Sequence, residues 1–259
     1  THNSSSAASD VYKRQLHKDG PLIVIAGAGS GKTRVLTYRI IHLINEGVDP
    51  FNILALTFTN KAALEMKNRI SLITSESVSR SIWMGTFHSI FARILRSEAP
   101  LIGYPTNFTI YDTYDSEKLI SNIIKEKKLD KDTYKAKSIK NRISSLKNNF
   151  ITVENYFNNS ELIEVDKAAK RDLFGEIYQE YVRRCFKASV MDFDDLLLKT
   201  NELLNKSPET LLKYQQKFKY ILVDEYQDTN YSQYLIVKAL ADRHENLCVV
   251  GDDSQSIYS

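Results

Sequence analysis

Short apolar runs alternate with longer amphipathic stretches along most of this chain. The runs lie at 22–25, 52–57, 82–84, 220–225 and 247–250, and each has the length of a strand. Continuous apolar runs of this kind are typical of parallel strands that are buried on both faces. The pattern therefore predicts an α/β fold with a parallel sheet flanked by helices.

The first helix expected in this fold follows the run at 22–25. Its apolar positions share one face, and they are Val35, Leu36, Ile40, Leu43 and Ile44. Gly47 would end this helix, because glycine is the usual residue just after a helical C-terminus. Two further helices are expected, one beginning in the Ala-rich stretch after Asn60 and one ending near Arg96.

The pattern changes between residues 108 and 191, where Lys-rich helical stretches occur without another parallel strand. Helices are predicted at 116–128, with Asp115 as the N-cap, and at 160–187. Between them, one more helix has an apolar face made by Ile139, Ile143 and Leu146. Because these helices have apolar stripes of their own, residues 108–191 are expected to form an all-helical insert subdomain.

The insert divides the predicted sheet domain into two parts, 16–107 and 192–259. Residues 1–15 include a Ser/Ala-rich stretch and have no periodicity. They are interpreted as a non-native or disordered segment and are left outside the fold.

The composition is that of an ordinary globular protein, with 42% hydrophobic and 26% charged residues, and it excludes the disordered class. No run of 18 apolar residues occurs, so no contact with a membrane is expected. Cys185 and Cys248 have no C-x-x-C spacing, which argues against a zinc site and against a disulfide framework. A reducing cytoplasm is therefore the expected location.

The net charge of +3 is too small to indicate nucleic-acid binding by itself. Its distribution is more informative, because residues 127–147 hold seven Lys and one Arg against only Asp130 and Asp132. A solvated helix face would explain this run, and so would a contact with a phosphate backbone. The charges alone leave both interpretations open.

The residues after the first apolar run carry the clearest candidate chemistry. The pattern G-x-x-x-x-G-K-[ST] is matched with alanine at its first position by Ala26, Gly27, Ala28, Gly29, Ser30, Gly31, Lys32 and Thr33. In such a loop, backbone N–H groups and the helix dipole point at one anion. Lys32 would reach the β- and γ-phosphates, and the Thr33 hydroxyl would bind Mg²⁺. A glycine-rich structural turn is the alternative.

Two adjacent acids, Asp224 and Glu225, end the fourth apolar run. Asp224 could hold Mg²⁺ opposite Thr33, and Glu225 could orient and deprotonate the water that attacks the γ-phosphoryl group. Many strands end in solvated acids, so the pair means little alone. Together with Lys32 it predicts nucleotide hydrolysis rather than binding only.

Polar and aromatic turns follow the second and third runs, at 58–66 and 85–89. Ligands gather at the carboxyl ends of strands in α/β sheets, so these turns are expected beside the phosphate loop. Phe58 and Phe87 could be core residues or platforms for base stacking, and His88 could be a structural or a catalytic histidine. The carboxylates in 192–195 could bind a metal, or they could be placed only by the helix dipole.

Taken in order, these segments resemble the motifs of the UvrD/Rep/PcrA family of superfamily 1 DNA helicases. The motifs are Ala26–Thr33, Thr57–Met66, Gly85–Ser89, Asp192–Leu196, Val223–Asn230 and Gly251–Tyr258. The resemblance implies a RecA-like first motor domain that carries the helical insert. It also implies hydrolysis of ATP with Mg²⁺, driving 3′-to-5′ movement on single-stranded DNA and at junctions of single-stranded and duplex DNA.

The resemblance assigns roles to individual residues. Catalysis would involve Lys32, Glu225 and Gln255, with Thr33 and Asp224 as the metal ligands. Nucleotide would be bound by 26–33 together with Arg34 and Gln227. Gln227 and Gln255 would sense the γ-phosphate. The single-strand track would be lined by Phe58, Thr59, Asn60, Thr86, Phe87, His88 and Tyr258. Stacking of a base on an aromatic ring contributes about 1–3 kcal/mol and tolerates any sequence.

The chain also departs from the family pattern. The Leu-Asn-x-x-Gln element whose glutamine reads adenine is absent, and Gln15 lies too close to the phosphate loop to replace it. The second motor domain of the same polypeptide is expected to be missing after Ser259, and with it the arginines that stabilise the transition-state charge. This chain is therefore expected to bind Mg-ATP weakly and to hydrolyse it poorly. The alternatives are a non-motor nucleotide- or DNA-binding fragment and the helicase part of a helicase–nuclease subunit. The oligomeric state stays open.

Overall fold

A computed structural model describes residues 19–25, 27 and 31–252 of the chain. The chain divides into two compact units. The sheet unit comprises Thr1–Ile90, Ser207–Thr229 and Tyr234–Ser259, and the helical unit comprises Phe91–Lys206 and Asn230–Gln233. The helical unit is therefore larger than the insert expected from the sequence.

The sheet unit contains a five-stranded parallel sheet with the order β1-β7-β6-β2-β3. Its strands are β1 (Leu22–Ile25), β2 (Ile53–Thr57), β3 (Trp83–Thr86), β6 (Tyr220–Val223) and β7 (Leu247–Gly251). Each coincides with a predicted apolar run to within two residues. Because all the strands are parallel, their carboxyl ends lie at one edge of the sheet, and the predicted α/β class is confirmed.

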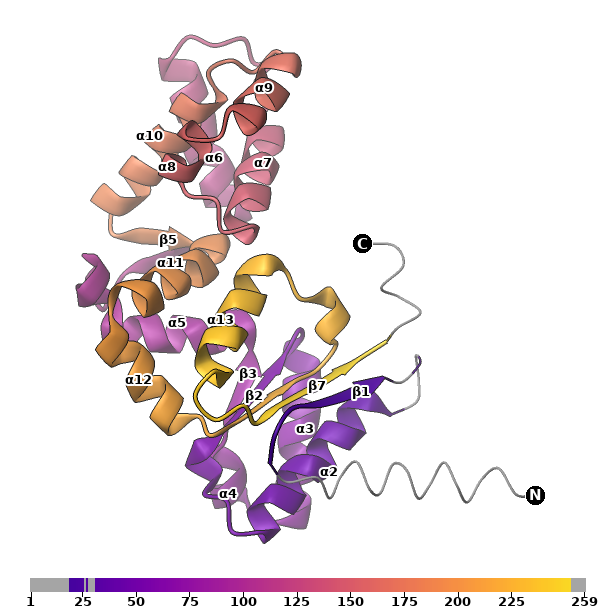
Figure 1. The fold of residues 1–259 in the computed structure, drawn as a ribbon. Helices are drawn as coiled ribbons and strands as arrows, with labels where there is room; N and C mark the ends of the chain where they lie inside the picture. Colours follow the sequence, from indigo (N-terminus) through magenta and orange to yellow (C-terminus); the bar gives the residue numbers. More distant parts are fainter. Residues whose placement is uncertain (1–18, 26, 28–30, 253–259) are drawn as a thin grey trace. The chain divides into compact units, whose positions relative to one another are not determined.

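Helices cover the sheet, as Figure 1 shows. Within the sheet unit they are α2 (Lys32–Asn45), α3 (Asn60–Ile73), α4 (Glu76–Ser81) and α12 (Pro208–Lys217), with 3-10 turns at Pro50–Asn52 and Tyr226–Asp228. Two others, α5 (Phe87–Glu98) and α13 (Tyr231–Ala241), have residues in both units. As predicted, α2 ends just before Gly47, whose φ of 85° favours glycine.

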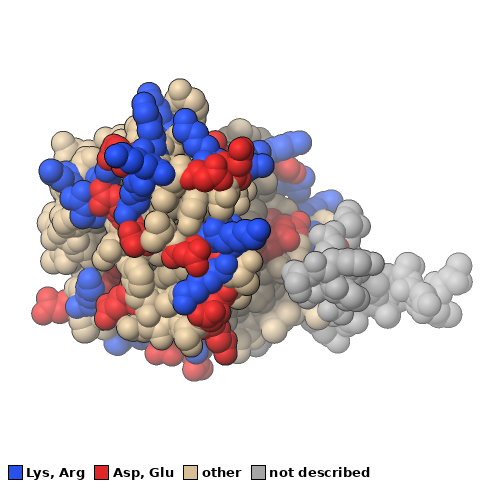
Figure 2. Space-filling model, turned by 90° about the horizontal axis from the view of Figure 1, so that it is seen from above, with Lys and Arg blue, Asp and Glu red and all other residues tan. Residues whose placement is uncertain are grey.

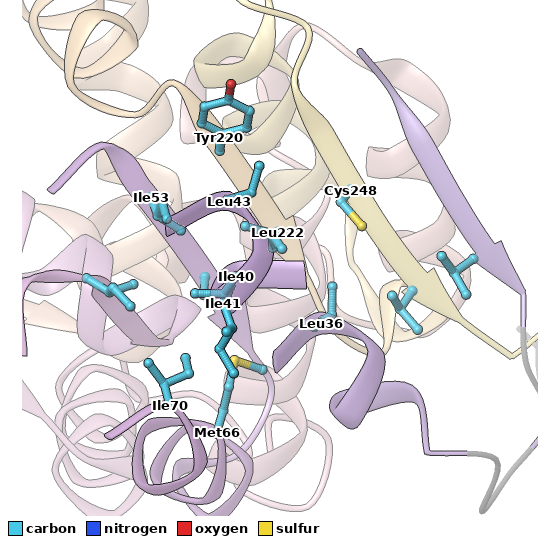
Figure 3. Close-up of a cluster of buried hydrophobic side chains, with 14 residues drawn as sticks. Leu36, Ile40, Ile41, Leu43, Ile53, Met66, Ile70, Tyr220, Leu222 and Cys248 are labelled. Atoms are coloured by element: carbon cyan, nitrogen blue, oxygen red, sulfur yellow. The ribbon is translucent and has the colours of Figure 1, made fainter. Parts of the chain in front are cut away.

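The core of the sheet unit lies between α2, α3 and one face of the sheet (Figure 3). Leu36 and Ile40 of α2 and Met66 of α3 are fully buried against the strands. The strand residues that alternate with this set, such as Leu54 and Val223, are buried as well. Burial on both faces is the physical reason why β2 and β6 appear in the sequence as continuous apolar runs, whereas Ile23 and Ile25 of the edge strand β1 are exposed.

The helical unit has a second core, formed by the apolar stripes of its helices. The helices of this unit are the 3-10 turn Ala99–Ile102, α6 (Thr113–Glu126), α7 (Ala136–Asn148), α8 (Val153–Phe157), α9 (Ser160–Ala168), α10 (Phe174–Lys187) and α11 (Phe193–Lys206). The predicted stripe of Ile139, Ile143 and Leu146 is buried in this core, which confirms it. No helix in the described part of the chain is long and apolar enough to cross a membrane.

Three details of the helical unit correct the sequence analysis. The unit is not all-helical, because β4 (Thr109–Tyr111) and β5 (Val190–Asp192) form a parallel pair too short to be recognised from the sequence. The predicted helix 160–187 is two helices, α9 and α10, separated by a turn in which Lys170 has a φ of 58°. The N-cap of α6 is Asp112, whose carboxylate accepts a hydrogen bond from the backbone of Asp115 at 2.8 Å.

Candidate functional site

Three neighbouring strands, β1, β7 and β6, end at the same edge of the sheet, and each is followed by candidate site residues. Lys32 and Thr33 begin α2 after the loop that follows β1. Asp224 and Glu225 follow β6 directly, and Asp252 follows β7. The parallel order of the strands therefore brings together charged groups that lie about 200 residues apart in sequence.

Lys32 lies between two carboxylates. Its Nζ is 2.9 Å from Oε2 of Glu225 and 3.5 Å from Oδ2 of Asp252. Burial acts to lower the pKa of Lys32, but the hydrogen bond and the negative charge of Glu225, with the charge of Asp252, outweigh it and raise the pKa. The ammonium group therefore stays charged between the two carboxylates. Asp252 was missed in the sequence analysis, although an acid directly after a buried strand was a usable signal.

Thr33 and Asp224 face each other, as the expected metal site requires. The Thr33 hydroxyl donates to Oδ2 of Asp224 at 2.7 Å, and the backbone N–H of Glu225 donates to Oδ1 at 3.1 Å. Asp224 is only 1% exposed, and burial raises the pKa of its carboxyl. A buried carboxylate beside a hydroxyl is a donor set that suits Mg²⁺, whose charge would offset the loss of hydration. These two residues therefore fit the ion.

Glu225 and Gln227 form the turn after β6. Glu225 has the left-handed φ of 48°, and its carboxylate accepts a hydrogen bond from Nε2 of Gln227 at 2.8 Å. Burial acts to raise the pKa of Glu225, but the hydrogen bonds from Gln227 and Lys32 outweigh it and lower the pKa. The backbone N–H of Asp252 donates to Oε1 of Gln227 at 3.0 Å. Gln227 thus connects the turn after β6 to the end of β7.

The phosphate loop is described only in part. Gly31 has a φ of 85°, a conformation that favours glycine directly before α2. Arg34 is exposed on the first turn of α2, with its guanidinium carbon 5.6 Å from the centroid of the Tyr38 ring. Some of the residues expected at the nucleotide or the DNA lie outside the described residues. They are Ala26, Ala28, Gly29, Ser30, Gln255 and Tyr258.

The two polar turns after β2 and β3 lie side by side, because Thr57 is the register partner of Thr86. The rings of Phe58 and Phe87 are in contact, with their centroids 5.5 Å apart. Phe87 is 1% exposed and is a core residue in this structure, whereas Phe58 is half-buried.

The other residues expected at the DNA lie on the same two turns. The Thr59 hydroxyl caps α3 by accepting a hydrogen bond from the backbone of Ala62 at 3.1 Å. Asn60 is exposed, whereas Thr86 and His88 are half-buried. The structure therefore groups the predicted DNA-binding residues that it describes at one end of β2 and β3.

The acids in 192–195 have a partner that the sequence analysis did not identify. Nζ of Lys147 lies 2.7 Å from Asp192 and 2.8 Å from Asp195, and Lys147 is fully buried. Among the described residues, no group of three or more His, Cys, Asp or Glu side chains could hold a metal ion. Lys147 therefore does not belong to a solvated basic face. A signal existed, because Lys147 continues the spacing of four residues that relates Ile139 to Ile143.

Comparison with known proteins gives the site its context. The profile of the family described as "UvrD/REP helicase N-terminal domain" matches residues 9–259. The chain is 48% identical over 241 residues to the ATP-dependent DNA helicase PcrA of Bacillus subtilis, covering 93% of this chain and 32% of that protein. It is 46% identical over 241 residues to the PcrA of Leuconostoc citreum, covering 93% of this chain and 31% of the relative.

The chain spans about a third of the length of these curated relatives. The family match begins at residue 9, inside the segment 1–15 that the sequence analysis had set apart. It includes every strand and helix described above, together with Lys32, Thr33, Asp224 and Glu225. By this match, which extends over nearly its whole length, the chain is a member of the UvrD/REP helicase N-terminal domain family.

Proposed function

We propose that this chain is the first motor domain, with its helical insert, of an ATP-dependent helicase or translocase that moves 3′ to 5′ along single-stranded DNA. One observation carries the proposal: Lys32 contacts Glu225, and Thr33 contacts Asp224, at the carboxyl edge of a parallel sheet. The curated relatives are named ATP-dependent DNA helicases. The direction of movement and the single-stranded substrate rest on the motif resemblance.

In the proposed reaction, Lys32 exchanges its contact with Glu225 for the β- and γ-phosphates of ATP. Thr33 and Asp224 would hold Mg²⁺, which supplies positive charge to the phosphate oxygens when it is bound. Glu225 has a lowered pKa and is therefore ionised, so it can accept a proton from the attacking water. Gln227 donates to the same carboxylate, and so it can sense whether Glu225 is engaged.

DNA would bind at the turns that follow β2 and β3, on the half of the sheet that the nucleotide residues leave free. Phe58 supplies a partly exposed ring, while Asn60, Thr59 and His88 supply polar groups. Phe87 would act through Phe58, because its own ring is buried. Stacking on an aromatic ring tolerates any base, as a motor that translocates along DNA requires.

The basic run of the helical unit would contact the phosphate backbone. Lys128, Lys131, Lys135 and Lys137 are exposed, whereas Lys127 is paired with Glu176 at 2.6 Å. Figure 2 shows Lys and Arg side chains interspersed with Asp and Glu on one face of the molecule. A mixed surface of this kind fits weak, salt-sensitive binding without sequence preference.

ATP turnover by the chain, with and without single-stranded DNA, tests the proposal. Wild type should bind Mg-ATP weakly and hydrolyse it slowly. In comparable phosphoryl-transfer enzymes, an arginine finger that stabilises the transition-state charge raises the rate 10³–10⁵-fold. Lys32→Ala should lose nucleotide binding, and Glu225→Gln should bind but not hydrolyse. Equal binding by wild type and Lys32→Ala would contradict the proposal. Binding of nucleotide or DNA without any turnover would instead favour a non-motor module.

A further inference from the structure

A short segment after the nucleotide residues belongs to the helical unit. Asn230–Gln233 is grouped with the helical unit, although Thr229 before it and Tyr234 after it belong to the sheet unit. The segment begins α13 and follows Glu225 after only four residues. It is therefore the point at which the loop of the proposed ATP site becomes part of the other unit.

Two hydrogen bonds fix this segment to the C-terminal turn of α7. Nδ2 of Asn230 donates to Oδ1 of Asn148 at 2.8 Å, and the Ser232 hydroxyl donates to the carbonyl oxygen of Lys147 at 2.8 Å. Asn148 in turn donates to Oδ1 of Asp194 at 3.2 Å. Two consecutive residues of α7 are thus bonded to the first residues of the segment. We call this pair of contacts the α7 clamp.

Both sides of the α7 clamp are held in place. Oδ1 of Asn230 accepts from the backbone of Gln233 at 2.9 Å, and Oε1 of Gln233 accepts from the backbone of Asn230 at 3.0 Å. This reciprocal pair is a capping box, which fixes the start of α13. On the other side, the buried contacts of Lys147 with Asp192 and Asp195 hold the end of α7.

The loop between Glu225 and Asn230 has little freedom of its own. The backbone N–H of Asp228 donates to the carbonyl of Glu225 at 2.9 Å, and that of Thr229 donates to the carbonyl of Tyr226 at 3.1 Å. These bonds make a tight turn, so a shift of Glu225 is passed along the backbone rather than absorbed. Gln227 lies in the middle of this turn and bonds Glu225 directly.

We propose that Asn148 and Asn230 are positioning residues that fix the start of α13 and thereby restrain the adjoining loop of Glu225 and Gln227, so that the state of the nucleotide site reaches the helical unit. The inference rests on the proposed function, because it takes that loop to respond to ATP. The α7 clamp includes none of the proposed nucleotide or metal residues. It acts by fixing the far end of a turn whose near end carries the proposed general base.

Hydrogen exchange of the ligand-free chain tests the holding role. Asn148→Ala should speed exchange of the backbone amides of 226–230 by roughly two- to tenfold, the change expected from losing one hydrogen bond. Asn230→Ser should act in the same way, because serine keeps the N-cap but is too short to reach Asn148. Asn149→Ala is the matched control, since the side chain of Asn149, among the described residues, bonds within its own helix turn, to the carbonyl of Ser145 at 2.8 Å. Unchanged exchange in both test variants would overturn the proposal.

A second arm adds Mg²⁺ and a non-hydrolysable ATP analogue. In wild type and Asn149→Ala the analogue should protect 225–229 and also 144–150, whereas in Asn148→Ala protection should stop at the loop. Protection that reaches 144–150 equally in Asn148→Ala would overturn the proposal, as would a wild-type loop that responds without any change in α7. If the analogue changes nothing and Lys32→Ala behaves as wild type, the proposed function fails, while the ligand-free comparison still decides whether the clamp holds the loop.

Discussion

Two clusters of one lysine and two carboxylates, within the part of the chain that the structure describes, differ in how completely the lysine is enclosed. In the sheet unit, Lys32 has one close partner, Glu225, whose side chain is 36% exposed, and a second partner at 3.5 Å. In the helical unit, Lys147 is fully buried and lies within 2.8 Å of both of its partners. We call the first cluster open, because Glu225 is partly exposed, and the second closed.

The closed cluster satisfies its own polar groups. The Tyr181 hydroxyl donates to Asp192 at 2.8 Å, and the backbone N–H of Asp195 donates to Asp192 at the same distance. In the open cluster, Glu225 accepts from Lys32 and from Gln227 and stays partly exposed. A lysine with two carboxylates therefore serves structure in the helical unit, whereas in the sheet unit it has the proposed role in chemistry, and the two clusters differ in enclosure.

Lys147→Met would break the closed cluster and should give the largest effect on stability. Removing the cation leaves two carboxylates buried without a counter-charge, which costs about 3–5 kcal/mol in comparable buried pairs. The difference in the free energy of unfolding between wild type and variant, measured with urea, gives this cost. Lys137→Met on the exposed side of α7 is the control and should change it by less than about 0.5 kcal/mol. A loss below about 1 kcal/mol in Lys147→Met would show that the cluster is not closed.

Asp195→Asn sharpens the comparison through pH. Burial, followed by the charge of Asp192, raises the pKa of Asp195 to about 6, so the folded state binds this proton more tightly than the unfolded state. The contribution of Asp195 to the free energy of unfolding is therefore greatest below about pH 4. It is lost as the pH rises through about 6, and the loss is at most about 3 kcal/mol. Asparagine cannot ionise, so the difference in unfolding free energy between wild type and variant should change across this window. A constant difference would contradict the assignment.

Lys32→Met tests the open cluster in the same way. Because Glu225 is partly exposed and screened by solvent, the variant should lose less than about 1 kcal/mol of stability, several-fold less than Lys147→Met. Urea unfolding of the two methionine variants under the same conditions makes the comparison direct. Equal losses would mean that both lysines are structural.

Gly251→Ala should give the smallest effect, and it is confined to the open cluster. A Cβ at this position would lie 3.0 Å from Oε1 of Gln227, so the glutamine side chain must shift away. A shift would weaken its bond to Glu225 and let the pKa of that carboxyl rise toward its ordinary value. Titration of the Glu225 carboxyl by NMR reads this directly, and an unchanged pKa would show that Gln227 does not control Glu225.

The sequence by itself determined the strands, most of the helices and the candidate residues of the proposed nucleotide site. Parallel strands that are buried on both faces are apolar along their length, and so β2 and β6 appeared as continuous runs. The spacing of Lys32 and Thr33 is fixed by a local turn, and so it was visible without the fold. The break between α9 and α10 was not visible in the pattern, and neither were the contacts of the buried Asp166 near it, which accepts from Arg142 and Arg171.

Only the tertiary structure decided which charged residues meet. Lys147 was counted in a basic run with two open interpretations, and Asp192 and Asp195 were interpreted as a helix start or a metal site. The spacing of Lys147 from Ile143 was a signal for its burial but not for its partners, since charges 45 residues apart carry no local sign of pairing. The contacts of Asp252 with Lys32 and of Asn230 with Asn148 likewise depend on strand order and helix packing. Local pattern fixes secondary structure and loop chemistry, whereas burial and pairing of charges arise only when distant segments exclude water together.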